Sequence, residues 1–110
     1  MEPHFQVEVS REDRRAILRL RGELDVSSSP ALEDELSRVS GLPVIVLDLS
    51  DLEFIDSTGL GVLVKSHQRV RDEGGRLAIV EGGGQVRRLL ELTGLDQQLT
   101  LVVSADELTD

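Results

Sequence analysis

An aliphatic strand that leads into an amphipathic helix, near the middle of the chain, limits the fold more than any other feature. Val44 to Leu49 is almost entirely aliphatic, which is typical of a strand covered on both faces. The next apolar residues recur with helical spacing and share one side of a helix: Leu60, Leu63, Val64, His67 and Val70. A buried strand followed by such a helix indicates an α/β domain.

The opposite side of the predicted helix carries residues that packing alone does not require. At 100° per residue, that side is formed by Ser57, Thr58, Gly61, Val62, Lys65 and Arg69. We expect this side to face solvent or a partner.

Two glycines, Gly59 and Gly61, stand in the first turns of this helix. Each costs roughly 0.5 to 1 kcal/mol relative to alanine in a helix. One interpretation is that Asp56 or Ser57 is the N-cap and that the glycines give the strand-to-helix corner its clearance. The other is that Gly61, one turn beyond Ser57, lets the backbone of another molecule approach an exposed hydroxyl. The two glycines together with the cap favour the second interpretation.

The same residues resemble a known family, the STAS domain, and within it the anti-sigma factor antagonists. That family is marked by a strand ending in D-L-S, a short turn, and F-[IM]-D-S-[ST]-G-L-G at the start of a helix. Asp48 to Ser50 and Phe54 to Gly61 match this pattern position by position. Gly22 to Asp25 and Val86 to Leu95 resemble two further family segments, so the resemblance covers nearly the whole chain.

The resemblance implies a binding module that is switched by phosphorylation and is not an enzyme. By resemblance, Ser57 accepts phosphate from a cognate anti-sigma factor serine kinase, and the unphosphorylated form binds that kinase and frees a sigma factor. ATP and Mg²⁺ then belong to the kinase, this chain needs no cofactor of its own, and a serine phosphatase is a further expected partner. The expected partner surface consists of Asp25, Asp56, Ser57, Thr58, Gly59, Gly61 and Lys65. Asp25 has a second interpretation, as a carboxylate that only shapes a turn.

Length and composition restrict the alternatives. At 110 residues the chain forms one domain, spanning 1–110, that is large enough to bury a core. It has no cysteine, which excludes disulfides and thiolate chemistry. A net charge of -9 and two aromatic residues argue against nucleic acid as a partner. The chain shows neither a signal peptide nor an apolar run long enough for membrane insertion, so we expect a cytoplasmic protein.

The remaining sequence predicts alternating strands and helices. Strands are expected around 5–9 and 16–21, joined by a loop over 10–14. Ser29 is the expected N-cap of a helix that Gly41 ends. Later come a strand over 76–80, a turn over 82–84, a helix over 85–93, a strand over 99–103 and a helix beginning with a capping box at 104–107. The fold class is therefore α/β, a STAS-like single domain. Its mixed sheet has an antiparallel first hairpin and parallel later strands, packed against helices.

Other functional patterns are weaker. Asp56 to Gly59 misses the D-[ST]-G of aspartic proteases by one residue, and Gly82 to Arg87 lacks the third glycine of a nucleotide-binding loop. The two histidines have no metal-site spacing around them. Two alternatives remain open: a STAS accessory subunit of an ABC-type transporter or of a larger sensory complex, and an enzyme that uses Ser57 as nucleophile. Asp56, a weak base for an alcohol, argues against the enzyme.

Overall fold

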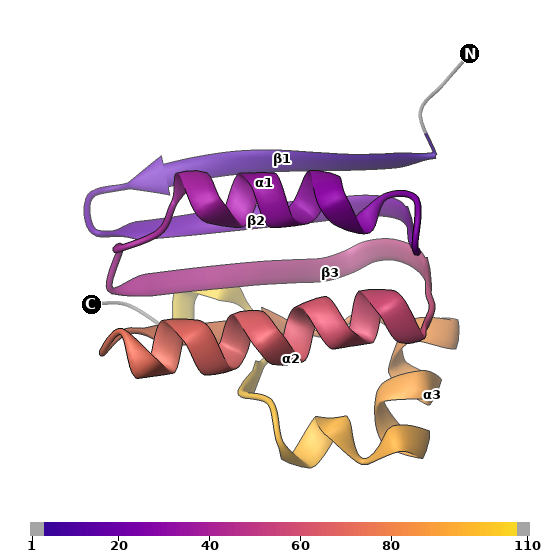
Figure 1. The fold of residues 1–110 in the computed structure, drawn as a ribbon. Helices are drawn as coiled ribbons and strands as arrows, with labels where there is room; N and C mark the ends of the chain where they lie inside the picture. The colour runs from indigo at the N-terminus through magenta and orange to yellow at the C-terminus, as the bar shows by residue number, and fades with distance from the viewer. Residues whose placement is uncertain (1–3, 108–110) are drawn as a thin grey trace.

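The computed structural model describes residues 4–107, which form five strands, three α-helices and two short 3-10 helices (Figure 1). In chain order the elements are β1 (Phe5–Glu12), β2 (Arg15–Leu24), α1 (Ser29–Arg38), β3 (Val44–Ile55), α2 (Ser57–Asp72), β4 (Arg76–Val80), α3 (Gly84–Thr93), η1 (Leu95–Gln97), β5 (Leu101–Val102) and η2 (Ala105–Glu107). None of the helices in the described part is long and apolar enough to cross a membrane.

The strands form one mixed sheet in the order β1-β2-β3-β4-β5. β1 and β2 are antiparallel, with Phe5 opposite Gly22 and Glu12 opposite Arg15. β2, β3, β4 and β5 are parallel neighbours, as expected for strands joined through helices. The predicted fold class is therefore confirmed.

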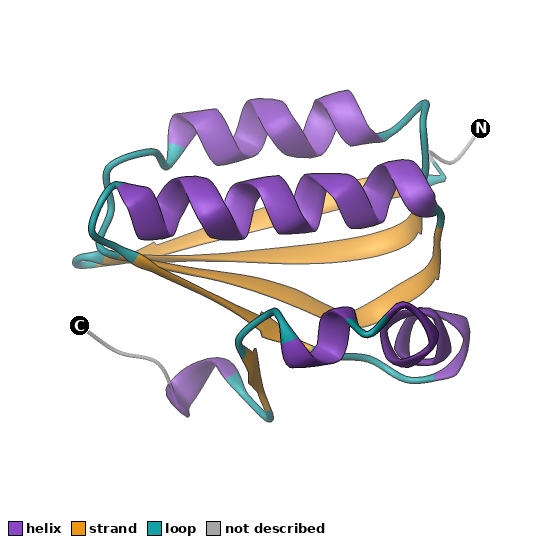
Figure 2. Cartoon of the chain, turned by 60° about the horizontal axis from the view of Figure 1, so that its bottom comes forward, coloured by secondary structure: helices purple, strands orange, loops and turns teal. Residues whose placement is uncertain are grey.

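Helices α1 and α2 lie side by side on one face of the sheet, and α3 lies apart from them near the end of β3 (Figure 2). The main core is formed by aliphatic side chains between these helices and the sheet, among them Leu18, Leu47 and Leu63, which have no exposed surface. A second, smaller cluster lies on the other face of the strands: Ile17, Val44, Val46, Ala78 and Val80. Val102 and Ala105 pack against this second cluster. The chain after β4 thus helps to cover the sheet's second face.

Three boundaries in the first half differ from the sequence predictions. One is the end of α1, which stops at Arg38 with Val39 as its C-cap and does not extend to Gly41. The loop expected over 10–14 is only a tight turn, because β1 continues to Glu12 and pairs with the start of β2. Asp13 in this turn has a φ of 57°, a left-handed conformation that aspartate tolerates better than most residues. Ser28, not Ser29, is the N-cap of α1, and it makes no side-chain capping bond. Ser29 instead donates its hydroxyl to the carbonyl oxygen of Asp25 at 2.7 Å.

The short turn expected between Ser50 and Phe54 is absent. β3 continues through this stretch to Ile55, still paired with β2, with a register shift near Arg21 and Gly22. An irregular pairing of this kind lets a strand bend and still keep its partner. The prediction failed because polar residues on this stretch resemble a loop, while the ladder of β2 holds it as a strand.

The second half follows the predictions more closely. β4 and α3 lie where they were expected, and Gly94 ends α3 with a left-handed φ of 75°. The strand expected over 99–103 is shorter, since only Leu101 and Val102 pair with β4. The expected terminal helix is a 3-10 turn, in which the Glu107 carboxylate accepts from the backbone N–H of Ser104 at 2.9 Å. The residues that would continue it, 108–110, lie outside the described part.

Candidate functional site

The parallel strands β2 and β3 end together and deliver Asp25 and Asp56 to one edge of the sheet. Leu24 stands opposite Ile55 in the register of the two strands. The backbone N–H of Asp56 donates to the carbonyl oxygen of Leu24 at 3.1 Å. The structure thus places Asp25 and Asp56 directly after the paired ends of β2 and β3, at the same edge of the sheet.

Asp56, and not Ser57, is the N-cap of α2. Its backbone is extended, with φ of -109° and ψ of -175°, and its Oδ1 accepts from the backbone N–H of Gly59 at 2.9 Å. This bond satisfies one of the N–H groups that every helix leaves unpaired at its start. Ser57 is therefore the first helical residue, with an exposed side chain at the positive end of the helix dipole. Thr58 is also exposed.

The two glycines of the motif have different structural roles. Gly59 is buried, and a Cβ placed on it would lie 2.8 Å from the carbonyl oxygen of Leu24 and 2.8 Å from Cγ1 of Ile55. Packing within the domain therefore requires a glycine there. Gly61 is exposed, and a Cβ on it would meet nothing within 4 Å. The fold gives no packing reason for the glycine at 61.

The outward side of α2 is narrower than the sequence predicted. Ser57, Gly61, Lys65 and Arg69 are exposed at successive four-residue steps. Val62, which was expected on this side, is only 6% exposed. That expectation was wrong because α1 packs beside α2, and Val62 belongs to the core cluster that includes Leu36 of α1. A groove runs between the two helices, and Lys65 and Arg69 are among its lining residues.

Asp25 organises the turn between β2 and α1. Its Oδ1 accepts from the hydroxyl of Ser27 at 2.8 Å and from the hydroxyl of Ser28 at 3.1 Å. The backbone N–H groups of both serines also donate to it, each at 3.1 Å. The Ser27 hydroxyl and these further bonds hold the pKa of Asp25 below its usual value of 3.8. This geometry bears out the turn-shaping interpretation and leaves the partner contact a proposal.

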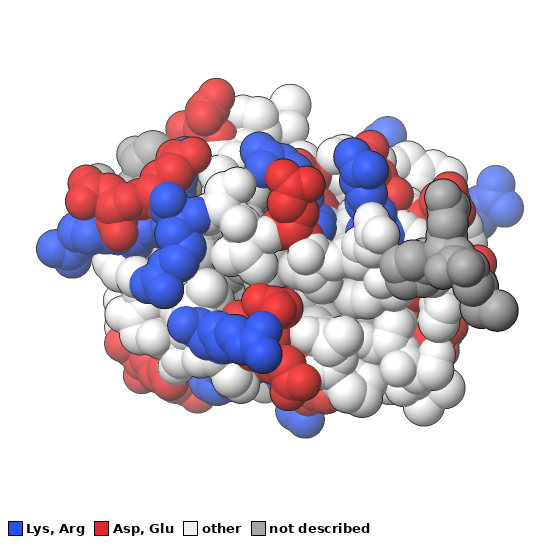
Figure 3. All heavy atoms as spheres, turned by 90° about the horizontal axis from the view of Figure 1, so that it is seen from above, with Lys and Arg blue, Asp and Glu red and all other residues white. Residues whose placement is uncertain are grey.

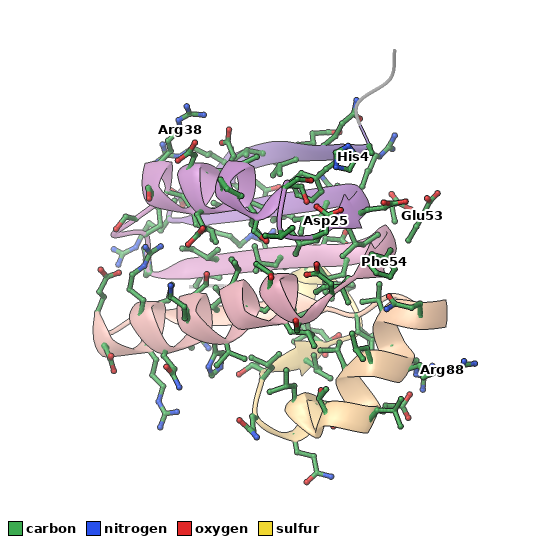
Figure 4. The ribbon with its side chains drawn as sticks, turned by 45° about the vertical axis from the view of Figure 1, so that its right-hand side comes forward. His4, Asp25, Arg38, Glu53, Phe54 and Arg88 are labelled. Atoms are coloured by element: carbon green, nitrogen blue, oxygen red, sulfur yellow. The ribbon has the colours of Figure 1, made fainter. Side chains whose placement is uncertain are left out.

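His4 approaches the same turn from the start of the chain. Its Nε2 lies 3.4 Å from the Ser27 hydroxyl and 4.0 Å from Oδ1 of Asp25. Figure 4 shows His4 and Asp25 at the same end of the domain as Glu53 and Phe54. The other histidine, His67, lies far along α2 with its Nε2 3.2 Å from the hydroxyl of Thr100. The two rings belong to different parts of the molecule.

Three residues at this edge were not predicted from the sequence. Val26, which follows Asp25 in the chain, is 69% exposed, and Phe54, which lies two residues before Asp56, is 39% exposed. The third, Gln85, pairs with the backbone of Ile55 through both ends of its carboxamide. Phe54 could have been recognised as the only aromatic residue in the motif. Gln85 has no sequence signal, because its partner lies 30 residues earlier.

The surface charge is mixed. On the face seen from above in Figure 3, acidic and basic side chains are interspersed. Arg38 and Glu35 of α1 form one close pair of opposite charges, at 2.6 Å. The net charge of -9 is therefore not gathered in one patch on that face.

Comparison with known proteins agrees with this geometry. The family model of the STAS domain matches residues 5–108. The anti-sigma F factor antagonist of Paenibacillus polymyxa is 35% identical over 95 residues, which cover 84% of this chain and 81% of that protein. The anti-sigma-B factor antagonist of Bacillus subtilis (strain 168) is 31% identical over 93 residues, which cover 84% of this chain and 85% of that protein.

A solved structure is similar as well. The crystal structure of an anti-sigma factor antagonist from Mycobacterium paratuberculosis superposes with a TM-score of 0.83 at 32% identity, covering 94% of this chain and 89% of that chain. Sequence motif, fold and relatives therefore point the same way. This chain belongs to the STAS domain family.

Proposed function

We propose that this protein is an anti-sigma factor antagonist that is switched by phosphorylation of Ser57. In its unphosphorylated form it binds an anti-sigma factor serine kinase, which releases a sigma factor from that kinase. Phosphate on Ser57 ends the binding, and a serine phosphatase restores it. The names of the relatives support the general role, and sigma-factor control is consistent with a cytoplasmic protein.

The observation that carries the switch is the pairing of an exposed Ser57 with an open Gly61 one turn further along α2. A helix surface without a side chain at 61 lets a partner backbone come close to the hydroxyl. Asp56, Thr58 and Lys65 border the same surface, and Asp25 lies beside it across the ends of β2 and β3. A partner that binds this surface would have to bury the Ser57 hydroxyl or the phosphate attached to it.

The chemistry of the switch is a phosphoryl transfer in which this chain is the substrate. The Oγ of Ser57 forms a bond to the γ-phosphorus of the ATP held by the kinase, and the bond from that phosphorus to the β-γ bridging oxygen breaks. ADP leaves, and the hydroxyl proton passes to a base of the kinase. Asp56 is poorly suited to be that base, because its carboxylate is engaged in capping Gly59.

Electrostatics explains why phosphorylation should change binding and not folding. A phosphoserine carries roughly -1.5 to -2 charges near neutral pH. At the first position of α2 this charge meets the positive end of the helix dipole, which stabilises the helix. In the bound state the same charge would have to be desolvated against the partner, and its bulk would stand over Gly61. Phosphorylation therefore weakens binding to the partner and does not destabilise the fold.

The test is phosphorylation by the anti-sigma factor kinase encoded in the same genome, with ATP and Mg²⁺, followed by mass mapping of the modified residue. We expect one phosphate, on Ser57. The exposed Thr58 serves as an internal control for a merely accessible hydroxyl, and the buried Ser66 as one for an inaccessible hydroxyl. A parent protein that binds no such kinase and accepts no phosphate would contradict the proposal and favour the transporter or sensory-complex alternative.

A further inference from the structure

Among residues 4–107, no second strand pairs with the end of β3 next to Ser57. β4 pairs with β3 only from Val44 to Asp48. Beyond this point β3 continues to Ile55 with β2 on one side. In a strand the backbone groups of successive residues point alternately to the two sides. Since Asp56 donates to Leu24 of β2, the N–H and C=O of Ile55 point to the side that β4 no longer occupies.

Gln85 occupies that side with its side chain. Its Oε1 accepts from the backbone N–H of Ile55 at 2.9 Å, and its Nε2 donates to the carbonyl oxygen of Ile55 at 2.9 Å. A primary carboxamide offers one acceptor and two donors, so it supplies the same pair of groups as a residue of a neighbouring strand. Gln85 thus replaces one rung of the missing strand.

The position of Gln85 is fixed by the glycine turn before α3 and by the packing of the helix. A Cβ on Gly82 would lie 2.5 Å from the carbonyl oxygen of Leu49, so the turn sits directly against β3. Gly84 has a φ of +60°, which favours glycine. Val86 and Leu90 of α3 are fully buried in the core. The glycine turn and the buried face of α3 therefore hold the Gln85 carboxamide against Ile55.

The residue that Gln85 holds directly precedes the cap and the switch. Ile55 is followed by Asp56, whose backbone donates to Leu24 and whose carboxylate caps Gly59. The chain entering Ser57 is thereby fixed from β2 on one side and from α3 on the other. We propose that Gln85 is a positioning residue for Ser57. It fixes the strand end from which the cap and the hydroxyl project, and so couples α3 to the switch. The phosphoryl-transfer part of this inference rests on the proposed function.

Two variants at position 85 test the hydrogen bonds between the Gln85 carboxamide and Ile55. Gln85→Ala removes both hydrogen bonds. Gln85→Glu keeps an acceptor for the N–H of Ile55, but an ionised carboxylate has no proton to donate to the carbonyl oxygen. Val9→Ala is the control for a general loss of stability, because Val9 packs against the core from β1, which does not pair with β3. Gln98→Ala controls for the loss of an exposed glutamine.

The first readout needs no partner. Amide hydrogen exchange of Ile55 and Gly59 is measured by NMR relative to Leu47 in the centre of the sheet, so that a general loss of stability cancels. We expect Gln85→Ala to speed exchange at both amides by at least about tenfold relative to Leu47. The amide of Ile55 loses its acceptor, and the amide of Gly59 loses the fixed position of the Asp56 carboxylate that caps it. In Val9→Ala and Gln98→Ala these ratios should match the parent. Unchanged exchange at Ile55 would show that the Gln85 carboxamide does not hold Ile55. Unchanged exchange at Gly59 would show that Gln85 is not coupled to the Asp56 cap.

The second readout is the phosphorylation of Ser57 by the kinase. We expect kcat/KM to fall about tenfold or more in Gln85→Ala and in Gln85→Glu, since a small displacement of a reacting group costs that much. The kcat/KM of the control variants Val9→Ala and Gln98→Ala should stay within about twofold of the parent value. Faster exchange in Gln85→Ala with parent-like phosphorylation would overturn the positioning role. A parent that is not phosphorylated would count against the proposed function, and the exchange ratios would still decide whether Gln85 positions the site.

Discussion

The carboxylate of Asp56 accepts a hydrogen bond from the backbone N–H of Gly59 at 2.9 Å. This bond joins the end of β3 to the first turn of α2, so one side chain sets where the strand stops and how the helix begins. Ser57 and Thr58 are the two residues enclosed by it. The position of the exposed hydroxyls therefore depends on a cap that can be tested by itself.

Replacing Asp56 with alanine should destabilise the domain by about 0.5 to 2 kcal/mol, the usual range for loss of an N-cap. Asp56→Asn should lose much less, because an amide oxygen can still accept from Gly59. Urea unfolding of the three proteins measures both differences. Equal stability of the parent and the alanine variant would show that the bond to Gly59 contributes nothing to folding.

The two glycines of the motif should respond in opposite directions to alanine. Gly61→Ala should raise stability by about 0.5 to 1 kcal/mol, because the site is open and alanine is the better helix former. Gly59→Ala should lower stability, because its Cβ would collide with the carbonyl oxygen of Leu24. Thermal melts of both variants provide the comparison.

Binding gives the second half of the glycine test. Gly61→Leu should fold as well as the parent and bind the kinase more weakly, because a bulky side chain would separate the partner from Ser57. Calorimetric titration against the kinase measures this effect. Unchanged affinity in Gly61→Leu would show that no partner approaches the helix at this position.

Substitutions of Ser57 should affect binding without affecting the fold. Ser57→Asp places a negative charge at the start of α2, so it should be as stable as the parent but bind the kinase at least about tenfold more weakly, a loss of ~1.4 kcal/mol. Ser57→Ala should bind well and accept no phosphate. Thr58 should not substitute for it, since the next helical residue points about 100° away.

Calorimetry and thermal melts of parent, Ser57→Asp and Ser57→Ala test these expectations together. Equal affinity of the parent and Ser57→Asp would contradict the electrostatic explanation of the switch. Phosphate on Thr58 in Ser57→Ala would contradict the assignment of the site.

Asp25 should make the stability of the domain depend on pH in the acid range. Its hydrogen bonds hold the pKa in the folded state below the value of 3.8 that it has when unpaired. A lowered folded pKa stabilises the native state above the unfolded pKa, and this stabilisation is lost as the pH falls through the folded pKa. The parent should therefore be more stable than Asp25→Asn at neutral pH, and the difference should shrink below pH 3.8. A constant difference down to pH 2 would contradict this origin.

The sequence by itself determined the fold class, the order of the elements and the identity of the motif. Alternation in β1 and β2, the aliphatic run of β3 and the helical spacing from Leu60 to Val70 were sufficient, because each element buries its own apolar face. The family resemblance also put Asp25 and Asp56 on one expected surface, and the parallel pairing of β2 and β3 brings the two residues to the same edge of the sheet.

The tertiary structure alone decided which residues of the motif are surface and which are core. Val62 is buried because α1 covers it, and Gly59 is fixed by the carbonyl of Leu24, whereas Gly61 has open space. It also decided that β3 runs to Ile55, where Gln85 meets it across 30 residues of sequence. Local patterns report only which face of an element is apolar. They do not report which distant element supplies the partner, because that depends on how the sheet brings the elements together.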